Sequence, residues 1–170
     1  LNYGSSGIGS SHHLTMEAIK AALGIDIRHV PYKGSGQSVP ALIGGQVECL
    51  FSALPSLAGF AKSNQVKILA SNAGQRSSLM PQVPSISEII PGFDFAVIIG
   101  ALAPANAPAG AIARLSAEAA AVKNHPELLA TMGTAGIDAV GSSPADYVKA
   151  IQSENERLAK AVALAGLKPE

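Results

Sequence analysis

Apolar and polar residues follow helical or strand periodicity along most of the chain. Apolar residues recur at helical spacing over 11–23, which predicts a helix there, and the run 26–30 predicts a strand that Pro31 ends. By the same criteria we expect further helices near 37–44, 54–61 and 85–90, and further strands at 1–3, 47–51, 66–70 and 95–102. Strands separated by helical crossovers predict an α/β fold with a mostly parallel sheet flanked by helices.

The last third of the chain has a different, helical pattern. Three helices are expected, at about 109–123, at about 126–132 and from Ser143 onward. Pro126 suits the first position of the second helix, and Ser143 with Asp146 has the spacing of a capping box at the start of the third. The apolar stripes of these helices need a surface to cover, and the preceding strand offers only part of it.

A Gly/Ser loop opens directly onto the first predicted helix. Residues 3–13 read Tyr-Gly-Ser-Ser-Gly-Ile-Gly-Ser-Ser-His-His. The first turn of a helix has amides without an intrahelical partner, and the helix dipole adds partial positive charge there. Glycines permit a close approach of the main chain, and serines add hydroxyl donors. The loop therefore suits a carboxylate, a phosphate or a sulfate; the structural alternative is a Ser-capped helix after a turn.

More specific loop motifs do not match. A phosphate-binding P-loop needs a lysine shortly after its second glycine, and none follows Gly9. The dinucleotide fingerprint needs a third glycine, but the residues after Gly7-Ile8-Gly9 are serine, serine and histidine. A nucleophile elbow centred on Ser6 would need glycine where Ile8 stands. The sequence therefore favours a simple anion-binding loop over a nucleotide-binding loop or the nucleophile loop of a hydrolase.

Composition narrows the function classes further. The 170 residues are 48% hydrophobic and 14% charged, with a formal net charge of zero. Without a basic cluster, binding to nucleic acid is not expected. No apolar run reaches the roughly 18 residues expected of a membrane span. The single Cys49 allows neither an internal disulfide nor a cysteine-based zinc site. Because the chain starts at Leu1 with no initiator methionine or signal peptide, we expect a fragment of a longer protein.

An ordered series of short motifs resembles the Bug-type substrate-binding receptors of tripartite tricarboxylate transporters, the TctC-like family. Each motif is weak alone, but their order and spacing cover nearly the whole chain. In sequence they are Tyr3-Gly-Ser-Ser-Gly-x-Gly-Ser-Ser, His29-Val-Pro-Tyr-Lys-Gly34, Leu42-Ile-Gly-Gly-Gln-Val47, Leu54-Pro-Ser56, Pro81-x-Val-Pro84, Gly100-Ala-Leu-Ala-Pro104 and Val140-Gly-Ser-Ser-Pro144.

The resemblance implies a two-lobed, hinged periplasmic binding protein of type II that holds a carboxylated metabolite. Residues 1–94 would form the second, inserted α/β lobe, and residues 95–170 would supply a strand and helices that return to the first lobe. That first lobe would be incomplete, because its N-terminal half is not in the chain. The resemblance also implies a periplasmic location for the parent protein and a membrane permease as its partner.

The resemblance places ligand contacts in three groups. Backbone amides and hydroxyls of the first loop would hold one carboxylate, partly through ordered water. A second group follows the strand ending at Pro31, and a third is a single serine where relatives often carry Asp or Asn. The residues are Ser5, Ser6, Gly7, Gly9, Ser10 and His13 in the first group, Tyr32, Lys33, Gly34 and Ser35 in the second, and Ser52 in the third.

Three functions from different classes remain open. The leading one is a receptor that captures a small organic anion without chemistry, without a cofactor and without a metal. The second is a hydrolase using a loop serine with His12 or His13, although carboxylates that could orient the base are scarce near the loop. The third is a truncated receptor acting as a homodimeric interaction module. No role is assigned to His29 or His125, and Lys33 could also be a solvated surface lysine.

Overall fold

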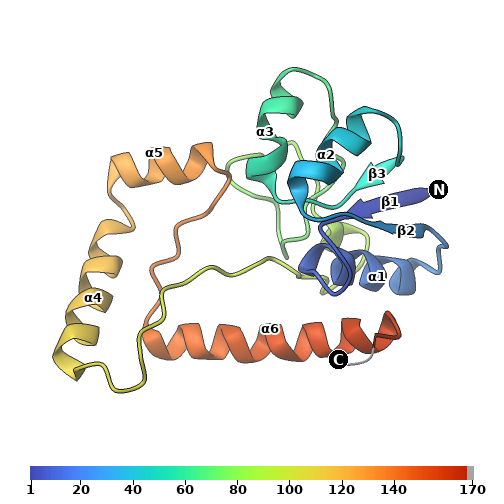
Figure 1. Ribbon diagram of the computed structural model, residues 1–170. Coiled ribbons are helices and arrows are strands. Elements are labelled where there is room, and N and C mark those ends of the chain that lie inside the picture. Colours follow the sequence, from blue (N-terminus) through green and yellow to red (C-terminus); the bar gives the residue numbers. More distant parts are fainter. Residues whose placement is uncertain (168–170) are drawn as a thin grey trace. The chain divides into compact units, whose positions relative to one another are not determined.

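The structure, a computed structural model, describes residues 1–167 (Figure 1). The last three residues of the expected segment 95–170 lie outside this range. Contacts divide the chain into two units: one comprises Leu1–Ala96 and the chain from Glu156 onward, and the other is Val97–Asn155. The expected division at residues 94 and 95 stays a prediction, and the placement of the chain beyond Glu156 with the first unit was not anticipated.

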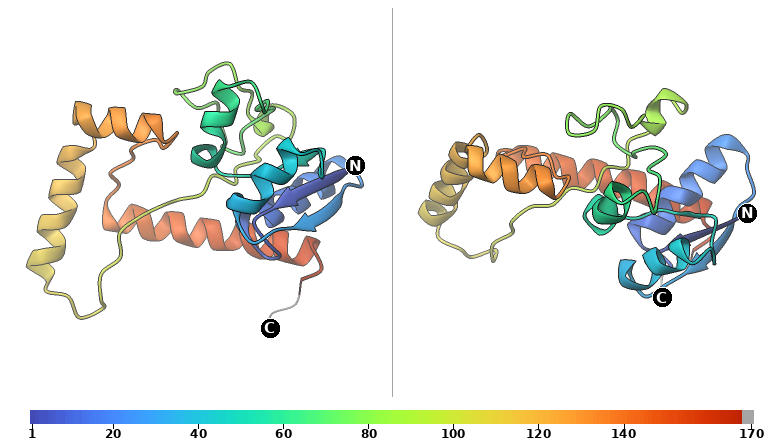
Figure 2. Two further views of the ribbon diagram at one scale, coloured as in Figure 1. Left: turned by 45° about the horizontal axis from the view of Figure 1, so that its top comes forward. Right: turned by 90° about the horizontal axis from the view of Figure 1, so that it is seen from above.

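A three-stranded parallel sheet organises the first unit. Its strands are β1 (Asn2–Ser5), β2 (Arg28–Pro31) and β3 (Cys49–Leu50), in the order β2-β1-β3. Tyr3 pairs with His29 on one side and with Cys49 on the other. Helices α1 (Ser11–Leu23) and α2 (Ser35–Ile43) lie on opposite sides of the sheet (Figures 1 and 2), and α3 (Leu54–Lys62) follows β3. The predicted α/β fold with a parallel sheet is confirmed.

Helix α1 has the bounds that its sequence predicts because both ends are capped. The hydroxyl of Ser10 accepts a hydrogen bond from the His13 amide at the N-terminus. Gly24 adopts a left-handed conformation with φ of 62° at the C-terminus, where its amide bonds the Lys20 carbonyl. The helix buries Leu14 in a small apolar core.

The core of the first unit joins α1 to the end of the chain. Leu14, Ala18, Phe93 and Ala161 form one buried cluster. Ala161 belongs to helix α6 (Pro144–Leu164), whose C-terminal part, in red, lies beside α1, in blue, in Figures 1 and 2. The C-terminal turns of α6 thus find their apolar partner in the first unit.

Three expected strands differ from prediction. The strand over 47–51 shrinks to Cys49–Leu50, and no strand forms over 66–70 or 95–102 within residues 1–167. Ser71 makes a single parallel bridge to Ser85 instead, ahead of a short 3-10 helix at Ile86–Glu88. A strand needs a ladder of hydrogen bonds to a neighbouring strand; the Phe95 amide bonds the Asn72 carbonyl, but within residues 1–167 neither run is assigned as a strand in a ladder. Ile99 accordingly remains 78% exposed.

The second unit contains two of the predicted C-terminal helices and the first turns of the third, α6. Helices α4 (Ala109–Val122) and α5 (Pro126–Thr134) end within two residues of their expected bounds. The hydroxyl of Ser143 accepts a hydrogen bond from the Asp146 amide, as the capping-box spacing predicts. The same hydroxyl donates a hydrogen bond to the Asp146 carboxylate. Neither α4 nor α5 has a fully buried residue, so their apolar stripes remain largely uncovered.

We expect Phe93→Ala to lower the free energy of unfolding of the first unit by about 3–5 kcal/mol, because it leaves a cavity beside Leu14 and Ala161. Ile89→Ala is the matched control, since Ile89 lies nearby in sequence but is 72% exposed. It should change stability by at most about 0.5 kcal/mol. Urea unfolding followed by circular dichroism measures both variants. Equal midpoints for the two would contradict the assigned core.

Candidate functional site

The three expected groups of site residues lie along one edge of the sheet. Parallel strands point the same way, so the segments that follow β1, β2 and β3 emerge at the same, carboxyl edge. The Tyr32 amide donates a hydrogen bond to the Ser5 carbonyl at 3.2 Å, which joins the first two segments. The hydroxyls of Ser35 and Ser52 lie 3.2 Å apart, which joins the second and third. The fold therefore brings together residues that are far apart in sequence.

Part of the expected anion-binding loop is already hydrogen-bonded to the protein itself. The Gly7 amide donates to the Ser5 hydroxyl at 3.1 Å, and the Gly9 amide donates to Nδ1 of His13 at 3.1 Å. The Ser10 amide reaches the Gly7 carbonyl at 3.3 Å. The sequence led us to expect backbone amides of this loop as donors to a carboxylate, but these three amides are paired within the protein, because the loop folds back on its own polar groups.

Other amides of the same loop remain available. Within residues 1–167, the backbone amides of Ile8, Ser11 and His12 make no hydrogen bond. Ser11 and His12 form the first turn of α1, where the helix cannot supply acceptors. Amide donors are therefore available at the helix N-terminus, but they belong to Ile8, Ser11 and His12 and not to the expected Gly7, Gly9 and Ser10.

The same loop also carries two hydroxyl groups, those of Ser6 and Ser10. The Ser6 hydroxyl lies 2.8 Å from Nδ1 of His12, whose ring also lies against Phe51 with centroids 5.9 Å apart. The Ser10 hydroxyl donates to the Gly7 carbonyl at 2.7 Å while it caps α1. Desolvation lowers the pKa of His12 below its ordinary value, so the ring is neutral at pH 7.

The second expected group contributes an exposed cation, Lys33. Lys33 is exposed and makes no ion pair with any residue of the described part. Its amide donates to the Gln37 side chain at 3.1 Å, so its backbone is fixed while its ammonium group is free. Gly34, with φ of 97°, precedes α2 and permits a turn that an ordinary residue would strain. The ring of Tyr32 packs close to Gly4 of β1, the packing alternative that its sequence left open.

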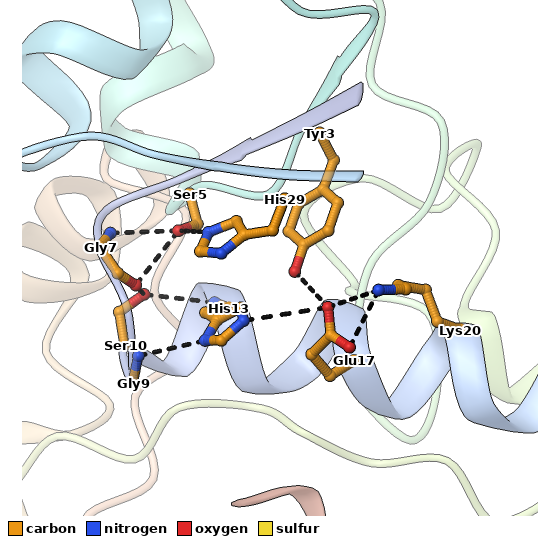
Figure 3. A network of polar contacts seen from close by, with 9 residues as sticks. All are labelled: Tyr3, Ser5, Gly7, Gly9, Ser10, His13, Glu17, Lys20 and His29. Carbon is orange, nitrogen blue, oxygen red and sulfur yellow. Dashed lines mark hydrogen bonds and ion pairs between the residues drawn. The ribbon is translucent and has the colours of Figure 1, made fainter. Parts of the chain in front are cut away.

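A buried polar network lies behind the first loop (Figure 3). The His13 ring is 6% exposed and stacks on the His29 ring, with centroids 4.0 Å apart and planes 12° from parallel. His29 also stacks on the Tyr3 ring and lies 2.6 Å from the Ser5 hydroxyl through Nε2. Glu17 accepts hydrogen bonds from the Tyr3 hydroxyl and from Lys20. The loop, α1, β1 and β2 thus share one network.

Burial keeps the two histidines of this network uncharged, while hydrogen bonds keep Glu17 charged. Burial, with His13 nearby, lowers the pKa of His29 to about 4, and burial also lowers the pKa of His13 despite the attraction of Glu17. Burial alone would raise the pKa of Glu17, but hydrogen bonds from Lys20 and Tyr3 outweigh it and lower that pKa. At neutral pH two uncharged histidines therefore lie beside a Glu17–Lys20 ion pair.

No feature of the sequence alone distinguishes His29 as a site residue. Its role depends on the register of β1 and β2, which places it opposite Tyr3, and on the position of α1 across the sheet. A partial signal was present on α1, where His13, Glu17 and Lys20 follow at spacings of four and three and therefore share one helix face.

Other chemistry finds little support in the described residues. No group of three or more His, Cys, Asp or Glu side chains in residues 1–167 is arranged to hold a metal ion. Ser6 and His12 form a hydroxyl–imidazole pair, but no carboxylate of this part of the chain hydrogen-bonds His12 to orient it. None of the described helices has both the length and the apolar character needed to cross a bilayer.

Comparison with known proteins identifies relatives over the full described length. The family described as "Tripartite tricarboxylate transporter family receptor" matches residues 1–167. A "UPF0065 protein in tcbD-tcbE intergenic region" from Pseudomonas sp. (strain P51) is 29% identical over 95% of this chain and 49% of its own length. The chain thus spans about half the length of the curated relatives that it matches.

Solved structures agree. An R. palustris protein solved with adipate has a TM-score of 0.85 and 28% identity, over 100% of this chain and 57% of the other. A second structure, described as that of a periplasmic transporter, has a TM-score of 0.79 and 30% identity, over 95% of this chain and 54% of the other. With a family match over nearly all of its length and these structural relatives, the chain belongs to the receptor family of tripartite tricarboxylate transporters.

Proposed function

We propose that the protein containing this chain is a periplasmic receptor that captures a small carboxylated metabolite and presents it to the permease of a tripartite tricarboxylate-type transporter, without chemistry. The observation that carries this proposal is the set of free amides of Ile8, Ser11 and His12 at the N-terminus of α1. The family to which the chain belongs and the relative solved with adipate support a carboxylate as the anion. A structural relative described as periplasmic supports the location.

In this proposal a carboxylate of the ligand accepts hydrogen bonds from the free amides, and the α1 dipole favours its negative charge. The hydroxyls of Ser6 and Ser10 lie in the same loop and can bond the ligand directly or through water. Lys33 supplies a mobile positive charge from the neighbouring segment. His13, which the sequence also led us to expect in contact with the ligand, is buried behind the loop and is left out of the proposed set. The proposed ligand-binding residues are otherwise those expected from the sequence, Ser5, Ser6, Gly7, Gly9, Ser10, Tyr32, Lys33, Gly34, Ser35 and Ser52, to which we add the amides of Ile8, Ser11 and His12.

The Ser35–Ser52 hydroxyl pair is a candidate for contact with a more distant part of the ligand. Both hydroxyls can donate as well as accept, so the pair suits a neutral or hydroxylated group as well as a second carboxylate. An Asp at position 52, as the resemblance leads us to expect in relatives, would instead accept only. This serine therefore affects which acid is preferred more than whether an anion binds.

Ser11→Pro tests the free amides with a change of one hydrogen-bond donor. Proline lacks the amide proton but is tolerated at the first helical position, and the preceding Ser10 has the extended conformation, with ψ of 157°, that a following proline requires. We expect its affinity for adipate to fall about tenfold or more, as for loss of a hydrogen bond to a charged group. NMR titration measures the affinities.

Ser11→Ala is the control, because it removes the hydroxyl and keeps the amide; its affinity should stay within about twofold of the unmodified chain. Unchanged adipate affinity in Ser11→Pro would contradict the assignment of these amides as the carboxylate-binding site. If adipate and other carboxylic acids all fail to bind, and light scattering shows a stable dimer, the truncated-module hypothesis is favoured over the receptor.

Lys33→Gln tests the contribution of long-range charge. Its affinity for adipate should fall, and the remaining binding should depend less on ionic strength, because salt screens the interaction between exposed charges. Lys62→Gln, at the end of α3, makes the same change of charge away from the loops. Calorimetric or NMR titrations at low and high salt compare the two. Equal effects of both substitutions would show that only net charge matters and that Lys33 has no specific role.

A further inference from the structure

His13 occupies a position in which its ring has no free edge for an external ligand. Its Nδ1 accepts the hydrogen bond from the Gly9 amide, and its Nε2 lies 3.9 Å from Oε1 of Glu17 (Figure 3). One ring face is stacked on His29, and the whole residue is only 6% exposed. The side chain thus contacts the loop from behind, on the side of the sheet.

The contact with Gly9 fixes the protonation state of His13. A ring nitrogen accepts a hydrogen bond only when it carries no proton, so the proton of the neutral ring is on Nε2, the atom nearest Glu17. The groups that face the ring include a carboxylate, an ammonium, a hydroxyl and a second imidazole. Glu17 from α1 and His29 from β2 lie directly against the ring, Lys20 and the Tyr3 hydroxyl bind Glu17, and the Ser5 hydroxyl lies against His29.

His29 supports the same loop through a second connection. Its Nε2 lies 2.6 Å from the Ser5 hydroxyl, which accepts the Gly7 amide at 3.1 Å. Gly7 and Gly9 have φ angles of 134° and 74°, so the loop has a conformation with two unusual turns. The stacked histidines therefore hold both of these turns, Gly9 directly and Gly7 through Ser5.

We propose that His13 is a positioning residue of the anion-binding loop: its uncharged Nδ1 binds the Gly9 amide and holds the loop in the conformation that leaves the amides of Ile8, Ser11 and His12 free for a ligand. This inference rests on the proposed function for the role of those amides. It gives His13 a place behind the ligand instead of the direct contact that the sequence led us to expect.

The proposal has a consequence in acid. A proton on Nδ1 would set two N–H donors face to face where they now lie 3.1 Å apart as donor and acceptor, so the contact with Gly9 must open. Burial, together with Lys20, lowers the pKa of His13, so this happens below the ordinary histidine range of about 6.5. The charge of His13 then helps to keep the pKa of the stacked His29 at about 4, because two charged rings at 4.0 Å would repel each other.

NMR spectroscopy of the 15N-labelled chain without ligand tests this directly. We expect long-range 15N–1H spectra at pH 7 to show His13 protonated on Nε2 alone, and the Gly9 amide to be protected from hydrogen exchange. As the pH falls, the Gly9 resonance should shift in the same step as the His13 ring. A proton on Nδ1 of His13 at pH 7, or a Gly9 amide that is indifferent to His13 titration, would overturn the proposal.

Three variants separate positioning from general stability. His13→Asn places an oxygen acceptor at the same number of bonds from the backbone as Nδ1, so Gly9 should stay protected to within about threefold while the pH step disappears. His13→Leu removes the acceptor, and Gly9 protection should fall about tenfold or more. His125→Asn, a change at an exposed histidine of the other unit, should change neither. If His13→Leu does not fold, His13→Asn decides: a pH step that persists in it contradicts the proposal.

Adipate titrations of the same proteins distinguish this inference from the proposed function. His13→Leu should bind adipate about three- to tenfold more weakly than the unmodified chain at pH 7, and His13→Asn should bind nearly as well. An unmodified chain that shows the Gly9–His13 contact but no adipate binding would contradict the proposed function and leave the positioning of the loop established. Equal adipate affinity in His13→Leu and the unmodified chain would contradict the positioning role.

Discussion

The first turn of α1 has amides that the helix cannot pair, and the structure around the site depends on how the chain satisfies some of them and leaves others free. The Ser10 hydroxyl takes the His13 amide, and the His13 ring takes the Gly9 amide just before the helix. The amides of Ile8, Ser11 and His12 remain without a partner in the described residues. The described chain therefore combines a capped helix with a small set of amide donors that have no acceptor in it.

The layer behind the loop makes this selective pairing possible. Ion pairing between Glu17 and Lys20 compensates charge within α1, and the Tyr3 hydroxyl adds a third hydrogen bond to the same carboxylate group. Next to this compensated ion pair, the His13 and His29 rings stack in their uncharged form. The parallel register of β1 and β2 sets this stack, because it brings His29 opposite Tyr3 and next to α1.

Much of this arrangement could be predicted from the sequence, because it depends on local signals. Ser10 and Gly24 are caps that sequence alone identifies, so α1 begins and ends where expected. The convergence of the Gly/Ser loop, Lys33 and Ser52 also follows once the sheet is known to be parallel. The pairing of the Gly9 amide could not be predicted, since it depends on a ring orientation that the stack with His29 determines. Strands at 66–70 and 95–102 have suitable apolar patterns but lack a neighbouring strand in the described chain.

A crystal structure of the chain grown with adipate would test the central claim most directly. We expect a carboxylate group whose oxygens lie about 3 Å from the amide nitrogens of Ile8, Ser11 and His12, with the Gly9 amide still bound to His13. Adipate bound elsewhere, or these three amides occupied by atoms of the chain itself, would contradict the account.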